Sequence, residues 1–528
     1  MSNRRPWSKV VLAFAIALVI GALLGSVVQT QINLMALRGL GVEIGAGAWF
    51  VTTLEDLAMF GPVYLAMFGV GFLVSQVVAM ALTRHVLESW RRLVCALAAA
   101  VGLWATFTIV DALAPPPTLI AATRASEGML AMLVTAAIAG WLFAVMAAPT
   151  DARRNGGAGA VAAVLLATLA GLPFDQARAQ SGPGYQLETV VSGLEHPWSL
   201  AFLPDGRMLV TERPGRLRII TRDGELLPEP VAGLPEVFNQ AQAGLFDVLP
   251  ARDFAESRLV YLSYACGTEQ ANHTCLARGR LETGRLGDVD ELFRVSPAKV
   301  GAAHYGGRMA WLEDGTLLLA LGDGFDYREE AQRLTSHIGT IVRLNPDGSV
   351  PADNPYVNEP EALPEIFSYG HRNIQGLVVD PDGGQVIAHE HGPRGGDEIN
   401  HVQAGTNYGW PVATHGLDYT WARVTPFTDY PGTEPPLLHW TPSIAPSGMT
   451  IYNGDRFPDW RGDILVGGLV SRAVHRVELN DNGATEKERL FTELNERIRD
   501  VRTGPDGAVY LLTDSARGRV ERAIPVQP

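Results

Sequence analysis

Cysteine, charge and, in the first third of the chain, histidine are scarce in this sequence of 528 residues. Three cysteines are too few for a disulfide-dependent scaffold. Only 19% of the residues are charged and the mean hydropathy is +0.09, both unusual for a purely soluble enzyme. The first 180 residues contain one histidine, His85, which argues against a b-type haem held between helices by two axial histidines.

Basic residues are also scarce relative to acidic ones after Gln180. Up to that residue the chain has 11 Lys and Arg against 8 Asp and Glu, whereas the remaining 348 residues hold 31 basic and 48 acidic ones. The net charge therefore changes from about +3 to about −17. Nucleic acid is excluded as a partner of the acidic part, because phosphate contacts need clustered Lys and Arg. Length and composition predict two domains, over residues 1–156 and 181–528.

Long apolar runs characterise the first domain. Four segments approach the ~20 apolar residues that a bilayer-crossing helix needs: residues 10–28, 61–82, 93–113 and 129–147. Basic residues flank alternate ends of these spans, at Arg4, Arg5, Lys9, Arg84, Arg91, Arg92, Arg153 and Arg154, while the opposite loops carry only Arg38 and Arg124. The positive-inside rule then places the N-terminus in the cytoplasm. The sequence predicts a multi-pass protein in the lipid of a bacterial inner membrane, with its acidic domain in the periplasm.

Residues 157–180 form a shorter apolar segment with two interpretations. It is either a fifth span or a signal-peptide-like segment, because Arg153 and Arg154 precede the apolar run and Ala177 and Ala179 stand before Gln180. Both interpretations put the second domain on the same side of the membrane.

Two of the three cysteines, Cys266 and Cys275, are nine residues apart in the second domain. In an oxidising compartment this spacing predicts a disulfide within one loop. A metal-binding pair is the alternative, although no second cysteine pair accompanies it.

A turn followed by a short apolar strand recurs six times after Gln180. Four copies begin with Asp-Gly, at Asp205, Asp314, Asp382 and Asp506, and two looser copies begin at Ser257 and Gly462. Asp-Gly suits tight hairpins, since both residues tolerate a positive φ. A β-sandwich explains the turns but not the long period, which is typical of a β-propeller. The sequence predicts an all-β propeller of six blades, with five or seven as alternatives, preceded by an α-helical transmembrane domain of four to five helices.

Polar residues gather in four stretches of this domain. His304, before an apolar strand, could act as a general base, and a structural histidine is the alternative. Arg372, Asn373 and Gln375 could cradle a planar ligand that carries carbonyl groups, unless they serve loop hydrogen bonds.

The third and fourth stretches suggest ions. Residues 390–400 and 407–410 combine acids with Gly- and Pro-freed carbonyls, which suit Ca²⁺ better than zinc despite the histidines nearby. Arg497 and Arg499 are two residues apart on a predicted strand, which places two positive charges on the same face. This arrangement favours an anionic ligand, and a solvated sheet edge is the alternative.

In this order the four stretches resemble the PQQ-dependent aldose sugar dehydrogenases of the glucose/sorbosone dehydrogenase family. The resemblance covers residues 185–526 and is most specific in the strings Glu-His-Gly-Pro-Arg-Gly-Gly-Asp-Glu-Ile-Asn and Asn-Tyr-Gly-Trp-Pro, from Glu390 and from Asn407. The transmembrane domain is not part of this family pattern.

The resemblance implies roles for individual residues. The catalytic base falls on His304, Asp323 would orient it, and Arg372 would stabilise charge. The implied PQQ-contacting side chains are Gln242, Arg372, Asn373, Arg497 and Arg499. The implied Ca²⁺ ligands are the carbonyls of Gly392 and Pro393 at the cofactor, and Glu398 and Tyr408 at a further site. The pattern departs from the family at Ala303, where Asp or Asn is usual, and near Val470, where a cofactor-contacting Lys is expected.

The implied reaction is oxidation of an aldose sugar at C1 to a lactone. His304 would take the hydroxyl proton while hydride passes to PQQ, with Ca²⁺ as Lewis acid. Electrons would then reach ubiquinone or another acceptor. A Ca²⁺-dependent propeller hydrolase, such as a lactonase, and a non-catalytic sugar-binding propeller are the alternative functions.

Overall fold

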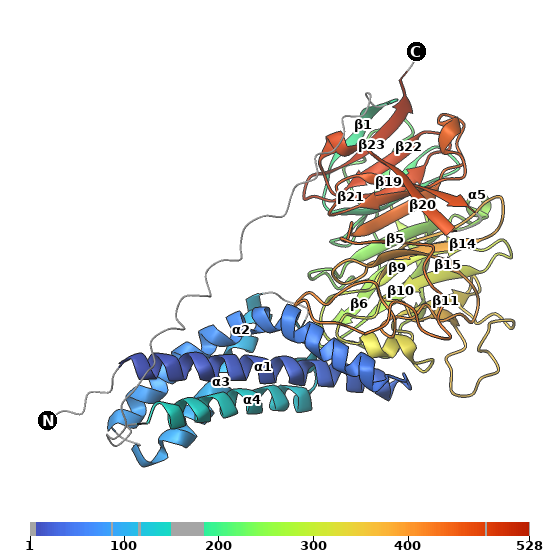
Figure 1. Cartoon of the computed structure of the whole chain (residues 1–528). Helices are drawn as coiled ribbons and strands as arrows, with labels where there is room; N and C mark the ends of the chain where they lie inside the picture. Colours follow the sequence, from blue (N-terminus) through green and yellow to red (C-terminus); the bar gives the residue numbers. More distant parts are fainter. Residues whose placement is uncertain (1–6, 86–87, 114–117, 149–183, 481–482, 527–528) are drawn as a thin grey trace.

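The computed structural model describes residues 7–85, 88–113, 118–148, 184–480 and 483–526. Within these ranges the chain forms an N-terminal helical bundle and a C-terminal six-bladed β-propeller, which lie against each other (Figure 1). The predicted fifth apolar segment, residues 157–180, lies outside the described residues.

Four long helices make up the bundle: α1 (Trp7–Gly39), α2 (Ala46–His85), α3 (Arg91–Leu113) and α4 (Ser126–Met146). Each is long and apolar enough to cross a membrane, as the sequence predicts. Small residues let the helices approach closely: a Cβ on Gly71 of α2 would lie 2.6 Å from the carbonyl oxygen of Gly102 on α3.

The two longest helices exceed a bilayer. At 1.5 Å per residue, α1 and α2 are about 50 and 60 Å long, against a hydrocarbon core of about 30 Å. Their surplus length carries buried polar residues, among them Gln29, Thr30, Asn33 and Asp56, and these lie at the end of the bundle that meets the propeller. The bundle therefore presents polar, hydrogen-bonding residues to the second domain at this end.

Six antiparallel sheets surround the propeller axis. In chain order the blades are β2 (Pro197–Phe202), β3 (Met208–Glu212) and β4 (Arg216–Ile220); β5 (Leu245–Pro250), β6 (Leu259–Thr268), β7 (Ala271–Leu281) and β8 (Leu286–Arg294); β9 (Gly306–Trp311), β10 (Leu317–Leu321), β11 (Thr340–Leu344) and β12 (Ile366–Tyr369); β13 (Ile374–Val379), β14 (Val386–Glu390), β15 (Asp397–Val402) and β16 (Leu438–Trp440); β17 (Pro446–Ile451), β18 (Ile464–Gly468), β19 (Val474–Asn480) and β20 (Gly483–Leu490); and β21 (Ile498–Thr503), β22 (Val509–Thr513) and β23 (Gly518–Pro525) with β1 (Tyr185–Leu194).

Short helices decorate the loops: α5 (Phe254–Ser257), η1 (Glu88–Trp90), η2 (Ala121–Arg124), η3 (Arg328–Gln332), η4 (Pro458–Trp460) and η5 (Thr492–Leu494). The first strands of the blades, β2, β5, β9, β13, β17 and β21, contact one another around the axis. Apolar residues of neighbouring blades fill the space between sheets, for example Leu209 of β3 against Leu245 of β5.

The six turn-and-strand repeats of the sequence all occupy the same position in their blades. Each lies between the first and second strand of a blade, so the blade count of six is confirmed. Gly206, Gly315 and Gly507 have φ values of 86–87° or 75° in these turns, where a side chain would be strained. The last blade is closed by β1, which pairs antiparallel with β23.

The cysteine pair forms the expected disulfide, but not within a loop. Cys266 lies on β6 and Cys275 on the adjacent β7, with Cα atoms 6.0 Å apart. The prediction of a single loop was wrong because the strands extend to Thr268 and start again at Ala271, which leaves only a two-residue turn. Both sulfurs are used in this bond, so the metal-pair alternative does not hold.

Candidate functional site

His304 and Asp323 form a buried pair at one end of the third blade. His304 lies just before β9 and Asp323 just after β10, and since these strands are antiparallel neighbours the two side chains meet. The distance from His304 Nδ1 to Asp323 Oδ1 is 2.6 Å, and the side chains are 4% and 1% exposed. The structure thus brings together the two residues that the resemblance assigns as base and orienting acid.

Electrostatics keep this pair as a neutral imidazole beside a carboxylate. Burial lowers the pKa of His304, and this outweighs the opposing attraction of Asp323. Burial acts to raise the pKa of Asp323, but His304 and Arg372 outweigh it and hold that pKa below its usual value. The Nδ1–H therefore donates to Asp323, and Nε2 is left as an acceptor.

Three further groups hold the pair in place. Trp410 Nε1 donates to Asp323 Oδ2 at 2.8 Å, and the Phe325 amide donates to Oδ1 at 2.8 Å. Gln242 Oε1 accepts the amide N–H of His304 at 2.9 Å. The departure at Ala303 therefore does not leave the histidine unsupported. His304 has a φ of 48°, a strained backbone region for a non-glycine residue that this scaffold enforces.

Arg372 lies between the pair and the loop after β14. Its Nη1 donates to the carbonyls of His391 and Gly392, the latter at 2.8 Å, and its Cζ lies 5.2 Å from the centre of the Trp410 ring. Arg372 lines a narrow pocket together with Asp323 and Trp410. A carbonyl oxygen can accept twice, so the bond to Gly392 leaves one acceptor position for a cation.

A cavity of ≈ 450 Å³ opens where the inner strands converge. Four of the five side chains that the resemblance assigns to PQQ line it: Gln242, Asn373, Arg497 and Arg499. Its volume is within the usual range for cofactor sites. Arg372 is not among its lining residues. Near the second departure from the family, Leu469 lines the cavity, whereas Val470 is exposed and Arg472 donates to Asn495 instead.

The paired arginines have a counter-ion that sequence reasoning missed. Asp514 Oδ2 accepts from Arg499 at 2.7 Å and from Arg497 at 3.4 Å, and its Oδ1 lies 3.1 Å from His196 Nδ1. Burial acts to raise the pKa of Asp514, but Arg499 outweighs it and holds that pKa far below its usual value. Two guanidinium groups thus share one carboxylate, which leaves positive charge at the cavity wall.

Two acidic residues on the neighbouring strands β14 and β15 suit a hard cation. Glu398 of β15 lies opposite Glu390 of β14 in register, and Asn400 Oδ1 is buried without a hydrogen-bond partner among the described residues. Two neighbouring carboxyl groups and an unpaired amide oxygen are the donor types that Ca²⁺ takes. The side chain of Tyr408, by contrast, donates to the carbonyl of His401 at 2.6 Å, so only its backbone oxygen is left as a ligand.

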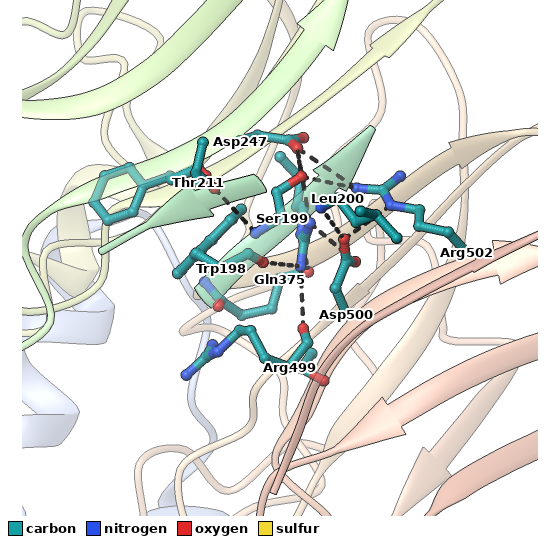
Figure 2. Close-up of polar contacts among 12 residues, drawn as sticks. Trp198, Ser199, Leu200, Thr211, Asp247, Gln375, Arg499, Asp500 and Arg502 are labelled. Atoms are coloured by element: carbon teal, nitrogen blue, oxygen red, sulfur yellow. Dashed lines mark hydrogen bonds and ion pairs between the residues drawn. The ribbon is translucent and has the colours of Figure 1, made fainter. Parts of the chain in front are cut away.

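A network of charges borders the cavity (Figure 2). Asp500 Oδ2 accepts from the amide of Leu200 at 3.0 Å and from Arg502 Nε at 2.9 Å, and Asp247 accepts from Ser199. Arg308, which is 3% exposed, places Nη1 3.1 Å from Asp500 Oδ1. These residues lie on the first strands of four blades and fix the strands around the axis.

Sequence reasoning also missed Lys299. Its Nζ lies 3.7 Å from the centre of the Tyr305 ring, and burial lowers its pKa to about 7. An isolated lysine between loop residues gives no signal of its own, and its position behind the His304 pair follows only from the fold.

A six-bladed propeller with a buried His–Asp pair beside a cavity lined by arginine and amide side chains defines a class, the propeller sugar dehydrogenases. The chain belongs to the Glucose / Sorbosone dehydrogenase family, whose sequence profile matches residues 194–522. This range leaves the helical bundle outside the match.

Relatives agree with this assignment. The aldose sugar dehydrogenase YliI of Escherichia coli is 42% identical over 345 residues, which are 64% of this chain and 92% of that protein. The solved structure of the soluble aldose sugar dehydrogenase of Escherichia coli in its apo form is 41% identical, covers 65% of this chain and all of that chain, and has a TM-score of 0.63. The PQQ-bound form of an aldose sugar dehydrogenase from Streptomyces coelicolor, 26% identical, covers the same shares with a TM-score of 0.53.

Proposed function

We propose that this protein is a membrane-anchored, PQQ- and Ca²⁺-dependent dehydrogenase that oxidises aldose sugars at C1 to lactones. The observation that carries the proposal is the buried His304–Asp323 pair beside the ≈ 450 Å³ cavity. A hydrolase would need neither the arginine pair nor the amide-lined cavity. PQQ is supported further by the PQQ-bound form of a related aldose sugar dehydrogenase.

The residues divide the chemistry between them. His304 Nε2 accepts the proton of the C1 hydroxyl, and Asp323 stabilises the imidazolium that forms. Arg372 offers positive charge to the oxygen at which negative charge develops. Gln242, Asn373, Arg497 and Arg499 would hold PQQ, and Ca²⁺ would be held by Gly392 and Pro393 carbonyls and, at a further site, by Glu398 and Tyr408. When bound, PQQ would accept the hydride and the adjacent Ca²⁺ would polarise its quinone.

The helical bundle and its flanking charges support a cellular location. The basic flanks of the spans favour a cytoplasmic N-terminus and a periplasmic propeller in a bacterial inner membrane. The Cys266–Cys275 disulfide supports an oxidising compartment. Electrons then leave to an external or membrane acceptor. Ubiquinone is the candidate in the membrane, and failure of the purified chain in lipid to reduce ubiquinone with a sugar present would exclude it.

Reconstitution tests the proposal. The full chain in detergent is given PQQ and CaCl₂, and reduction of a dye is followed with a panel of aldoses. Sugar-dependent dye reduction that needs both additions supports the dehydrogenase. Lactone hydrolysis without PQQ, or sugar binding without turnover, would replace it with the hydrolase or the sugar-binding propeller.

The pH dependence follows from the state of His304. The base must be neutral, and burial lowers its pKa, so activity is lost only when the pH falls below this depressed value. We expect the acid limb of kcat/KM to lie below about 6.5, the ordinary pKa of histidine. Dye reduction measured between pH 4 and 9 checks this, and a limb at or above that value contradicts it.

Arg499 and Arg497 should differ in their effect on PQQ binding. Arg499 is 12% exposed and Arg497 is 45% exposed, so the charge of Arg499 is less screened by water. We expect Arg499→Gln to weaken PQQ binding about 10- to 100-fold, the effect of losing a charge-assisted hydrogen bond. Arg497→Gln is the matched control with a smaller effect. Quenching of tryptophan fluorescence by added PQQ measures both, and equal effects would contradict the prediction.

A further inference from the structure

The helical bundle lies against the propeller (Figure 1), and its contacts fall on loops close to the candidate active site. The Arg423 amide donates to Asp56 Oδ1 at 2.7 Å, and its Nε lies 2.9 Å from Glu55 Oε2. Asn33 accepts from Arg328 at 3.0 Å and donates to the carbonyl of Arg423. The bundle also packs on Val412, Phe427 and Tyr430, so its contacts fall on two propeller segments, one at 326–328 and one at 412–430.

These two propeller segments adjoin the His304–Asp323 pair, because Phe325 directly precedes Asp326 and Trp410 lies two residues before Val412. Phe325 and Trp410 donate to the two oxygens of Asp323, as described above. Tyr419 Oη accepts from Arg372 Nη2 at 3.4 Å. The propeller surface that contacts the bundle is therefore separated by only one layer of residues from the groups that would carry out the reaction.

Arg124 is a residue of the bundle that reaches these groups. It lies on η2, between α3 and α4, and its side chain is 14% exposed. Its Nε lies 3.3 Å from Asp326 Oδ1, and its Cζ lies 5.8 Å from the centre of the Phe325 ring. Arg124 lines the same narrow pocket as Asp323 and Arg372.

Phe325 links Arg124 to the base. Its ring meets the His304 ring edge to face, with centroids 5.0 Å apart, and stacks on Tyr419 at 6.0 Å. Phe325 has a φ of 66°, which is strained for an aromatic residue and persists only where the surroundings enforce it. Two guanidinium groups lie near this ring, that of Arg124 from the bundle and that of Arg372 from the propeller, whose Cζ is 6.0 Å from the ring centre.

We propose that Arg124 is a positioning residue of the dehydrogenase site, through which the helical bundle holds Phe325 and thereby the His304–Asp323 pair. The proposal rests on the proposed function for its kinetic consequence. The bundle is then a wall of the active site as well as an anchor.

The test compares two arginines of one interface. In the full chain in detergent, Arg124→Gln is expected to lower kcat about 10- to 100-fold, the effect of a small misplacement of reacting groups, with KM within about 2-fold. Arg423→Gln, which removes an ion pair of the same interface, should leave both constants within about 2-fold. Arg124→Lys keeps the charge over the ring and should restore part of the loss.

The pH profile separates positioning from a general loss of structure. The charged groups facing His304 are Asp323, Arg372 and Lys299, and none is altered. A loosened Phe325 lets water reach the imidazole, so its depressed pKa rises and the acid limb moves to higher pH in Arg124→Gln. Arg124 itself is faced by Asp326, Arg328, Glu329 and Asp418. If the double variant Arg124→Gln/Asp326→Asn regains full activity, Arg124 only neutralises Asp326 and the proposal is overturned.

A second measurement does not depend on activity. Hydrogen exchange of the peptide that contains Phe325 should become faster in Arg124→Gln and stay unchanged in Arg423→Gln. An inactive wild-type chain would defeat the proposed function, while this exchange difference would still support the positioning contact. Equal exchange and equal kinetics in the two variants would overturn the role of Arg124.

Discussion

Replacing His304 by glutamine is expected to lower kcat for aldose oxidation by about 10²- to 10⁴-fold, the usual contribution of a general base. Glutamine can still donate to Asp323, so the buried carboxylate keeps a partner and the fold is preserved. It cannot accept the proton of the C1 hydroxyl at neutral pH. Dye reduction with saturating PQQ, Ca²⁺ and sugar measures the loss.

Two comparisons make the result specific. PQQ affinity, measured by tryptophan quenching, should stay within about 3-fold of wild type, because a general base acts in the chemical step. His273 on β7, which contacts the carbonyl of Val295 and does not line the cavity, is the control, and His273→Gln should leave activity unchanged. A His304→Gln enzyme that keeps more than a tenth of wild-type kcat would remove this residue from the role of base.

The central charge network should give the largest loss of stability. Asp500 is 0% exposed and faces both Arg308 and Arg502, so Asp500→Ala leaves the buried Arg308 and the partly exposed Arg502 to share Asp247. Removing one partner of a buried pair costs about 3–5 kcal/mol, because the remaining charge loses its compensation. We expect a fall of this size in the free energy of unfolding, read from the denaturation midpoint of the detergent-solubilised chain by near-ultraviolet circular dichroism.

A matched acid shows whether burial is the cause. Asp290 on β8 is 66% exposed and lies 3.7 Å from Arg278, so Asp290→Ala should cost less than about 1 kcal/mol. The double variant Arg308→Met/Asp500→Ala should recover part of the loss, since fewer unpaired charges stay buried. Similar losses from Asp500→Ala and Asp290→Ala would show that the network does not stabilise the ring.

The architecture could be predicted from the sequence because short, local sequence patterns specify it. A blade needs a tight turn between its first two strands, and Asp-Gly marks that turn in four of the six blades. Membrane-length helices likewise follow from apolar runs alone. The ends of α1 and α2 were harder, because their polar residues resemble ordinary loops until a second domain covers them.

The site was only partly accessible because its partners come from distant segments. Asp323 and Trp410 are separated by 87 positions and meet only after two blades have formed. Arg497 and Arg499 suggested unpaired like charges, although Asp514 follows directly after Thr513, which pairs with Ile498. Strand register would have revealed this counter-ion. No pattern within either domain could reveal that Arg124 lies beside Phe325.

The pairing of β1 with β23 sets an order on biosynthesis. The first strand of the propeller, β1, is synthesised after the bundle and before the other strands, and its partner β23 is the last strand of the propeller. Five blades can form as the chain emerges, yet the ring stays open until β23 has been synthesised. A product that lacks β23 would therefore expose the unpaired edge of β1 to the cell's proteases, so degradation would remove chains whose ring cannot close.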